Sequence, residues 1–193
     1  MDLVGLNDFV KFKPKKLSGG LLRRLNIACG IAHRPDIIIL DEPTVAVDPQ
    51  SRNNILEGIK KLNEEGSTII YTSHYMDEVD FLCDDIVIID KGKVIANGNS
   101  NELKDMIDVS EKISFVADDL TDDVKEKLRN MGHIIDFAYK DGTCKMTFSK
   151  SEENLLSLVR ILSDNKVSYR SINVEKPSLN DVFLDLTGKD LRD

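Results

Sequence analysis

The sequence predicts an α/β domain over residues 1–108, followed by a small α+β domain over residues 109–193. The first prediction rests on two short apolar runs at 37–40 and 68–73. A helical pattern lies between them, as a helix lies between two consecutive parallel strands. The second prediction rests on six segments after residue 110, which have strand-like and helical periodicity in turn.

The first half alternates helix and strand. A helical pattern begins near residue 20 and ends before Arg34-Pro35-Asp36, and the run at 37–40 that follows is typical of a buried parallel strand. Pro49 suits the first turn of the next helix, and Gly66 suits its end. Beyond the second strand we expect a short helix from Tyr75, a strand at 86–89, a turn at 90–93, a strand at 94–96 and a helix at 102–107.

The second half follows the order β-α-β-β-α-β. Its expected strands are 113–117, 135–139, 144–148 and 167–174, and its expected helices are 121–131 and 151–162. This order is the ferredoxin-like arrangement. A last helix begins at Pro177-Ser178, where Ser178 and Asp181 are spaced as a capping box. Its apolar side chains Val182, Phe183 and Leu186 are predicted to dock on the first half or on a second copy of the chain.

Composition narrows the class of protein. The 193 residues are 41% hydrophobic and 31% charged, which is typical of a soluble globular protein, and the net charge of −8 argues against a nucleic-acid partner. No apolar run approaches the roughly 20 residues that span a bilayer, and acidic Asp2 after Met1 is unlike a signal peptide. The three cysteines are far apart and are predicted to be small buried residues in a reducing compartment.

Two carboxylates follow the first strand. Open α/β sheets bind ligands at the carboxyl ends of their strands, so Asp41 and Glu42 emerge where a nucleotide would lie. Their side chains alternate in direction, so one can hold Mg²⁺ through water while the other orients an attacking water. The alternative is that an acid at a strand end only caps the next turn.

Two further elements carry groups that bind phosphate. Ser18-Gly19-Gly20 precedes a helix, where serine caps free N–H groups and glycine permits close approach of an anion. His74 follows the second strand, and its neutral imidazole can donate to a phosphate oxygen. Each has an ordinary alternative, namely a Ser N-cap after a turn and a satisfied polar residue at a strand end.

Taken in order, these segments resemble the ATP-binding subunit of an ABC transporter of the exporter type. Leu17, Ser18, Gly19 and Gly20 match the signature motif, Asp41 the Walker B aspartate, Glu42 the glutamate that follows it, Asp48 the D-loop and His74 the H-loop. The resemblance extends from about residue 4 to residue 106, and the tail after Pro177 also resembles exporter-type relatives. It implies that the first domain is the C-terminal portion of a P-loop NTPase domain.

The sequence departs from the family pattern at three places. Leu21 stands where many members carry Gln, and Ala46-Val47 replaces the commoner Gly-Leu. The P-loop pattern G-x-x-x-x-G-K-[ST] is absent, because Gly92-Lys93 and Gly188-Lys189 are followed by Val and Asp. We therefore expect this chain to be a C-terminal portion of the family pattern and to be inactive alone.

The resemblance also implies roles and partners. Two subunits would sandwich two ATP molecules. Each site would take Asp41 for Mg²⁺, Glu42 and His74 for catalysis from one subunit, and Leu17 to Gly20 with Asp48 from the other. The subunit would lie in the cytoplasm, held at the membrane by a transmembrane permease. A soluble ATPase of the same family and a non-catalytic regulatory module remain as alternatives.

Overall fold

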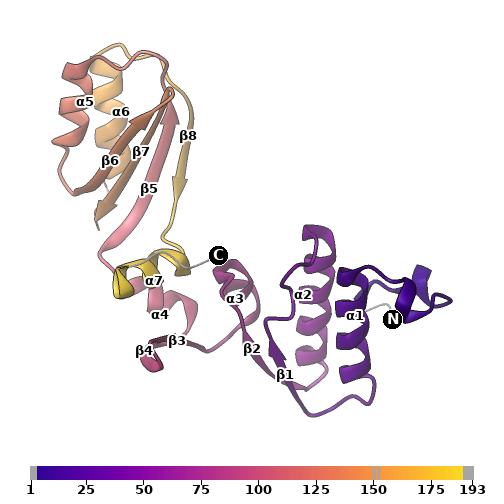
Figure 1. The fold of residues 1–193 in the computed structure, drawn as a ribbon. Coiled ribbons are helices and arrows are strands. Elements are labelled where there is room, and N and C mark those ends of the chain that lie inside the picture. The colour runs from indigo at the N-terminus through magenta and orange to yellow at the C-terminus, as the bar shows by residue number, and fades with distance from the viewer. Residues whose placement is uncertain (1–3, 150, 152, 189–193) are drawn as a thin grey trace. The chain divides into compact units, whose positions relative to one another are not determined.

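The structure is a computed structural model that describes residues 4–149, 151 and 153–188 (Figure 1). The chain forms two compact units, Met1–Ile86 and Val87–Asp193. The division falls inside one strand, β3 (Ile86–Asp90). The domain boundary expected at residue 108 stays a prediction.

The first unit contains the predicted pair of parallel strands. β1 (Ile37–Asp41) pairs with β2 (Thr68–Thr72) in a register that places Asp41 opposite Thr72. Its other elements are α1 (Gly19–Ile31), α2 (Pro49–Glu64), α3 (Met76–Leu82) and the short 3₁₀ turns η2 (Asn7–Phe9) and η3 (Pro14–Lys16). Its buried core joins α1, α2 and the N-terminal segment through Val4, Leu6, Ile27, Val47, Ile55 and Ile59.

The two faces of this parallel pair differ in burial. Ile38 is 6% exposed, whereas its neighbours Ile37 and Ile39 are 61% and 69% exposed. The prediction that residues 37–40 form a buried strand is therefore wrong for one face. Successive side chains of a strand point to opposite faces, and only the face that carries Leu40 packs on the core of α1 and α2 in the described part of the chain.

The second unit contains the predicted ferredoxin-like sheet. Its antiparallel strands have the order β6-β7-β5-β8, which is the arrangement that a β-α-β-β-α-β chain produces. The strands are β5 (Val109–Val116), β6 (Ile134–Lys140), β7 (Thr143–Ser149) and β8 (Arg170–Glu175). Helices α5 (Asp122–Arg129) and α6 (Asn154–Asp164) pack on one face of the sheet (Figure 1), and their core includes Phe115, Leu128, Phe148, Leu158 and Leu162.

Two short elements precede this sheet. β3 pairs with β4 (Lys93–Gly98), as the predicted turn between them requires. Helix α4 (Ser100–Asp105) starts two residues before the predicted position. The cause is a capping box, in which the Asn99 side chain accepts from the Glu102 N–H while the Glu102 carboxylate accepts from the Asn99 N–H.

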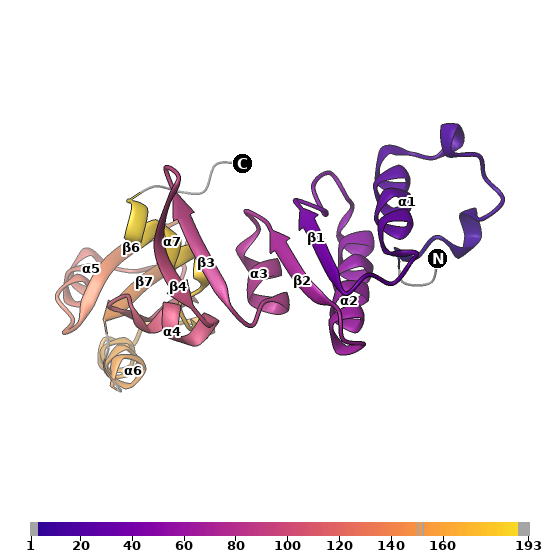
Figure 2. The same cartoon turned by 90° about the horizontal axis from the view of Figure 1, so that it is seen from below.

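The last helix, α7 (Leu179–Thr187), packs against α4 (Figure 1). Figure 2 shows the nearby hairpin of β3 and β4. Its predicted capping box between Ser178 and Asp181 is present. Leu179 and Val182 are buried, as is Leu103 of α4. The expected stripe is buried at Val182, partly buried at Phe183 and wrong for Leu186, which is 40% exposed because the contact lies towards the start of the helix.

An ion pair joins the same helix to the sheet. Lys112 of β5 donates to the carboxylate of Asp181. Burial would raise the pKa of Asp181, but the hydrogen bonds from Lys112 and Ser178 outweigh it and lower that pKa. The N-terminal end of α7 is therefore held by its own cap and by the central strand β5.

The burial of the cysteines and the length of the helices can be compared with the sequence predictions. Cys144 is buried, and burial raises the pKa of its thiol to about 12. Cys29 is exposed and Cys83 is only partly buried, so the prediction that all three cysteines are buried holds for Cys144 alone. Within the described ranges, no helix is both long and apolar enough to cross a membrane.

Candidate functional site

Asp41 lies at the carboxyl end of the parallel strands. The pairing of β1 with β2 places it opposite Thr72, whose hydroxyl donates to Asp41 Oδ1 at 2.5 Å. The Asp41 side chain is exposed at this strand end, so it remains accessible to a ligand from solvent. A carboxylate next to a hydroxyl is an oxygen-rich position of the kind that Mg²⁺ prefers.

Glu42 and His74 contact each other directly. The Glu42 N–H donates to the carbonyl of Thr72 at 3.1 Å, and the backbone of Glu42 has a φ of +46°. His74 Nδ1 lies 2.9 Å from Glu42 Oε1. Since an ionised carboxylate only accepts, Nδ1 carries the proton in this contact. Glu42 Oε2 is buried without a hydrogen-bond partner among the described residues.

Arg23 fixes the turn that carries these carboxylates. Its guanidinium extends from α1 and donates to the carbonyls of Asp41 at 3.0 Å, Glu42 at 2.7 Å and Pro43 at 3.2 Å. A residue held at positive φ costs free energy and persists only where surrounding contacts support it. Arg23 supplies such contacts, and the only signal for it in the sequence is its place early in the helix after Ser18-Gly19-Gly20.

The predicted signature residues form the start of α1. Ser18 is the N-cap, and its Oγ accepts from the Leu21 N–H at 3.3 Å. A Cβ added to Gly19 would meet nothing within 4 Å, and one added to Gly20 would make only an ordinary contact with the Ala46 carbonyl at 3.9 Å. Packing inside the described chain does not require either glycine. Leu17, which precedes the cap, is half-buried and donates its N–H to the carbonyl of Pro14.

Asp48 is the N-cap of α2. Its Oδ1 accepts from the Ser51 N–H at 2.9 Å, and the hydrogen bonds from Ser51 lower the pKa of the Asp48 carboxyl. Ala46 just before it has a φ of +59°, a conformation that glycine adopts without cost. The departure from the family's Gly-Leu therefore places a strained alanine in this loop.

The structure brings three of the predicted residues into one group. Asp41, Glu42 and His74 meet at the ends of β1 and β2, with Thr72 and Arg23 as supports that the sequence did not indicate. Asp48 and residues 17–20 instead begin the neighbouring helices α2 and α1. The described residues hold no cluster of three or more His, Cys, Asp or Glu side chains placed to bind a metal. Mg²⁺ usually keeps several waters and needs only one or two carboxylates, so the role of Asp41 as its ligand stays a prediction.

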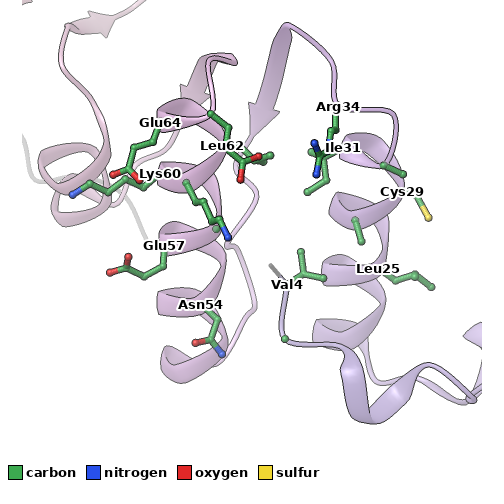
Figure 3. Close-up of a pocket in the computed structure, with 16 residues that line it drawn as sticks. Val4, Leu25, Cys29, Ile31, Arg34, Asn54, Glu57, Lys60, Leu62 and Glu64 are labelled. Atoms are coloured by element: carbon green, nitrogen blue, oxygen red, sulfur yellow. The ribbon is translucent and has the colours of Figure 1, made fainter. Parts of the chain in front are cut away.

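One hollow of the first unit lies away from the predicted site residues. A groove of about 1180 Å³ separates α1 from α2 (Figure 3). Leu25 and Ile31 line it from α1 and Leu62 from α2, with charged residues of α2 towards its rim. None of the predicted site residues lines this groove. A smaller hollow of about 340 Å³ includes Asp41, Arg23 and Pro43 in its lining, so the strand end that carries Asp41 borders a hollow of its own.

Known families match both halves of the chain. The profile of the family described as "ABC transporter" matches residues 1–45. The profile described as "ATP-binding protein DrrA1-3-like, C-terminal domain" matches residues 98–187. The second match includes α4 and α7 together with the ferredoxin-like sheet.

Three relatives align with nearly the whole chain. The linearmycin resistance ATP-binding protein LnrL of Bacillus subtilis is 40% identical over all of this chain and 63% of its own length. The daunorubicin/doxorubicin resistance ATP-binding protein DrrA of Streptomyces peucetius is 34% identical over 97% of this chain and 57% of its own length. The Nod factor export ATP-binding protein I of Ralstonia nicotianae is 31% identical over 98% and 60%.

The chain therefore spans less than two thirds of the length of these relatives. The alignments nevertheless run across both of its compact units. Together with the two profile matches, they show that this chain is similar to ABC transporter ATP-binding proteins over nearly its whole length.

Proposed function

We propose that this chain is the C-terminal portion of an ATP-hydrolysing subunit that powers an ABC exporter. The observation that carries the proposal is the contact between Glu42 and His74 beside Asp41, at the carboxyl end of paired parallel strands. The names of the relatives concern resistance and export, and the second domain matches a DrrA-like domain. These findings favour an exporter over a soluble ATPase or a regulatory module of the same family.

The group at the strand ends has the polar atoms that phosphoryl transfer needs. Asp41 would hold Mg²⁺ through water, and the bound metal would neutralise phosphate charge. Glu42 would orient the attacking water with the oxygen that has no partner among the described residues. The Nδ1–H of His74 would donate a hydrogen bond to Glu42 Oε1, and a protonated Nε2 would donate to a terminal phosphate oxygen. A donating Nε2 requires the charged imidazolium form.

The start of α1 would close the site of a second subunit. The Ser18 oxygen accepts from the Leu21 N–H, which leaves the hydroxyl proton to donate to phosphate. Gly19 and Gly20 leave the backbone open to an anion at the positive end of the helix. Leu17 and Asp48 flank this surface in the same proposal. Transmembrane permease subunits would hold the ATPase at the cytoplasmic face of the membrane.

ATP hydrolysis tests the proposal. The 193 residues contain no P-loop, whose charge-assisted phosphate contacts are worth roughly 1.5–3 kcal/mol each, so we expect this chain alone to show no micromolar affinity for Mg-ATP by calorimetry. A protein with a P-loop-bearing segment ahead of residue 1 should bind and hydrolyse ATP. The proposal fails if that longer protein folds and binds ATP without hydrolysing it.

A further inference from the structure

Glu78 is the most heavily bonded buried carboxylate of the first unit. It lies on α3, the helix that follows His74, and is only 2% exposed. Its Oε2 accepts from the hydroxyls of Thr44 at 2.8 Å, Tyr71 at 2.6 Å and Ser73 at 3.1 Å. Its Oε1 forms an ion pair with Arg52 Nε at 3.2 Å. Buried charges are kept only where such partners compensate them, so this carboxylate fixes the positions of its neighbours.

These partners flank the candidate site on three sides. Thr44 lies two residues beyond Glu42, Ser73 immediately precedes His74, and Arg52 lies in the first turns of α2 after Asp48. Glu42 contacts His74, His74 adjoins Ser73, Ser73 bonds Glu78, and Glu78 bonds Thr44 on the Glu42 segment. The contacts form a closed ring through Glu78.

A second set of contacts supports the other side of His74. The Arg52 guanidinium lies 4.3 Å from the centroid of the Tyr75 ring, and that ring lies 4.2 Å from the His74 ring. The Tyr75 N–H also donates to Ser73 Oγ at 3.0 Å. Glu78 therefore reaches both neighbours of His74, one directly and one through Arg52.

We infer that Glu78 is a positioning residue that holds His74 against Glu42. The inference rests on the proposed function, because it gives that contact a role in ATP hydrolysis. A purely structural role predicts losses of stability without a specific change at His74. The positioning role instead makes Ser73 matter more than Tyr71, because only Ser73 adjoins His74, although both bond the same oxygen.

Nitrogen NMR of the imidazoles tests the inference in the 193-residue chain, without ATP. The chain has three histidines, and His74→Gln identifies the signals of His74. The unmodified chain should show His74 with its proton on Nδ1. Glu78→Gln and Ser73→Ala should both shift it towards the Nε2-protonated form, whereas Tyr71→Phe and the exposed control Glu57→Gln should not. Ser73→Ala removes a single hydroxyl, so it still tests the inference if Glu78→Gln fails to fold.

The same variants are then compared in a protein that carries a P-loop. Glu78→Gln and Ser73→Ala should lower kcat by about tenfold or more while KM for ATP stays within about twofold, because misplacement acts on the chemical step. The inference is overturned if both variants keep the Nδ1 signal and kcat of the unmodified protein, or if Tyr71→Phe matches Ser73→Ala in both readouts. If the unmodified protein with a P-loop does not hydrolyse ATP, the proposed function is wrong. The NMR comparison in the 193-residue chain would still decide the role of Glu78.

Discussion

The packing of α4 on α7 predicts a large effect from one small substitution. Leu103 of α4 is fully buried, and α7 buries Leu179 and Val182. Leu103→Ala removes buried methyl groups and leaves a cavity, which costs about 2–5 kcal/mol in well-packed cores. That is a large share of the roughly 5–15 kcal/mol by which a domain is stable. Urea unfolding of the 193-residue chain, with amide exchange of α7 followed in parallel, measures the loss.

Met106 provides the matched control. It ends the same helix but is 54% exposed, so Met106→Ala should change stability by no more than about 0.5 kcal/mol. A second comparison uses two shorter chains, residues 98–188 and residues 109–188, because only the first retains α4. The longer of these should be the more stable. Equal effects of the two alanine substitutions, or equal stability of the two shorter chains, would refute the importance of this contact.

Two further predictions concern the first unit. Ala46→Gly should raise the free energy of unfolding by up to about 1 kcal/mol, because glycine adopts the left-handed conformation of residue 46 without strain. The control Ala28→Gly inside α1 should lower the free energy of unfolding by about 1 kcal/mol. A lower free energy of unfolding for Ala46→Gly in urea would contradict this prediction. Burial, and then the hydrogen bond to Glu78, raise the pKa of Tyr71 above its usual 10.0. Above about pH 10 the unfolded chain therefore loses the tyrosine proton more readily than the folded chain, so the free energy of unfolding should fall as pH rises. It should fall less in Tyr71→Phe. Identical alkaline profiles for the two proteins would contradict the second prediction.

Local signals explain what the sequence predicted well. Ser18, Asp48 and Ser178 each begin a helix in the structure, because the side chain of an N-cap bonds an N–H only two or three residues away. The order of the ferredoxin-like strands follows in the same way from short connections and alternating side chains. Such features depend on neighbours along the chain, and their residue types and spacing are visible in the sequence.

The features that the sequence did not predict depend on contacts between segments that are far apart in the chain. Glu78 bonds Thr44 from 34 residues away, and Arg23 reaches the carbonyl of Glu42 from 19 residues away. Neither partner is indicated by periodicity, since a carboxylate on a short helix is usually solvated. The sequence also showed no sign that Ile39 is exposed. An apolar run predicts a strand, but it does not show which of the two faces of that strand is covered.

The substitution Glu42→Gln tests most directly whether Glu42 orients the attacking water. In a protein that carries a P-loop, the amide fills the same space but is a poor base, so ATP turnover should fall by about a hundredfold or more while ATP affinity is kept. Asp41→Asn should instead weaken binding that depends on Mg²⁺. Turnover close to the unmodified rate in Glu42→Gln would contradict the role assigned to the carboxylate that His74 contacts.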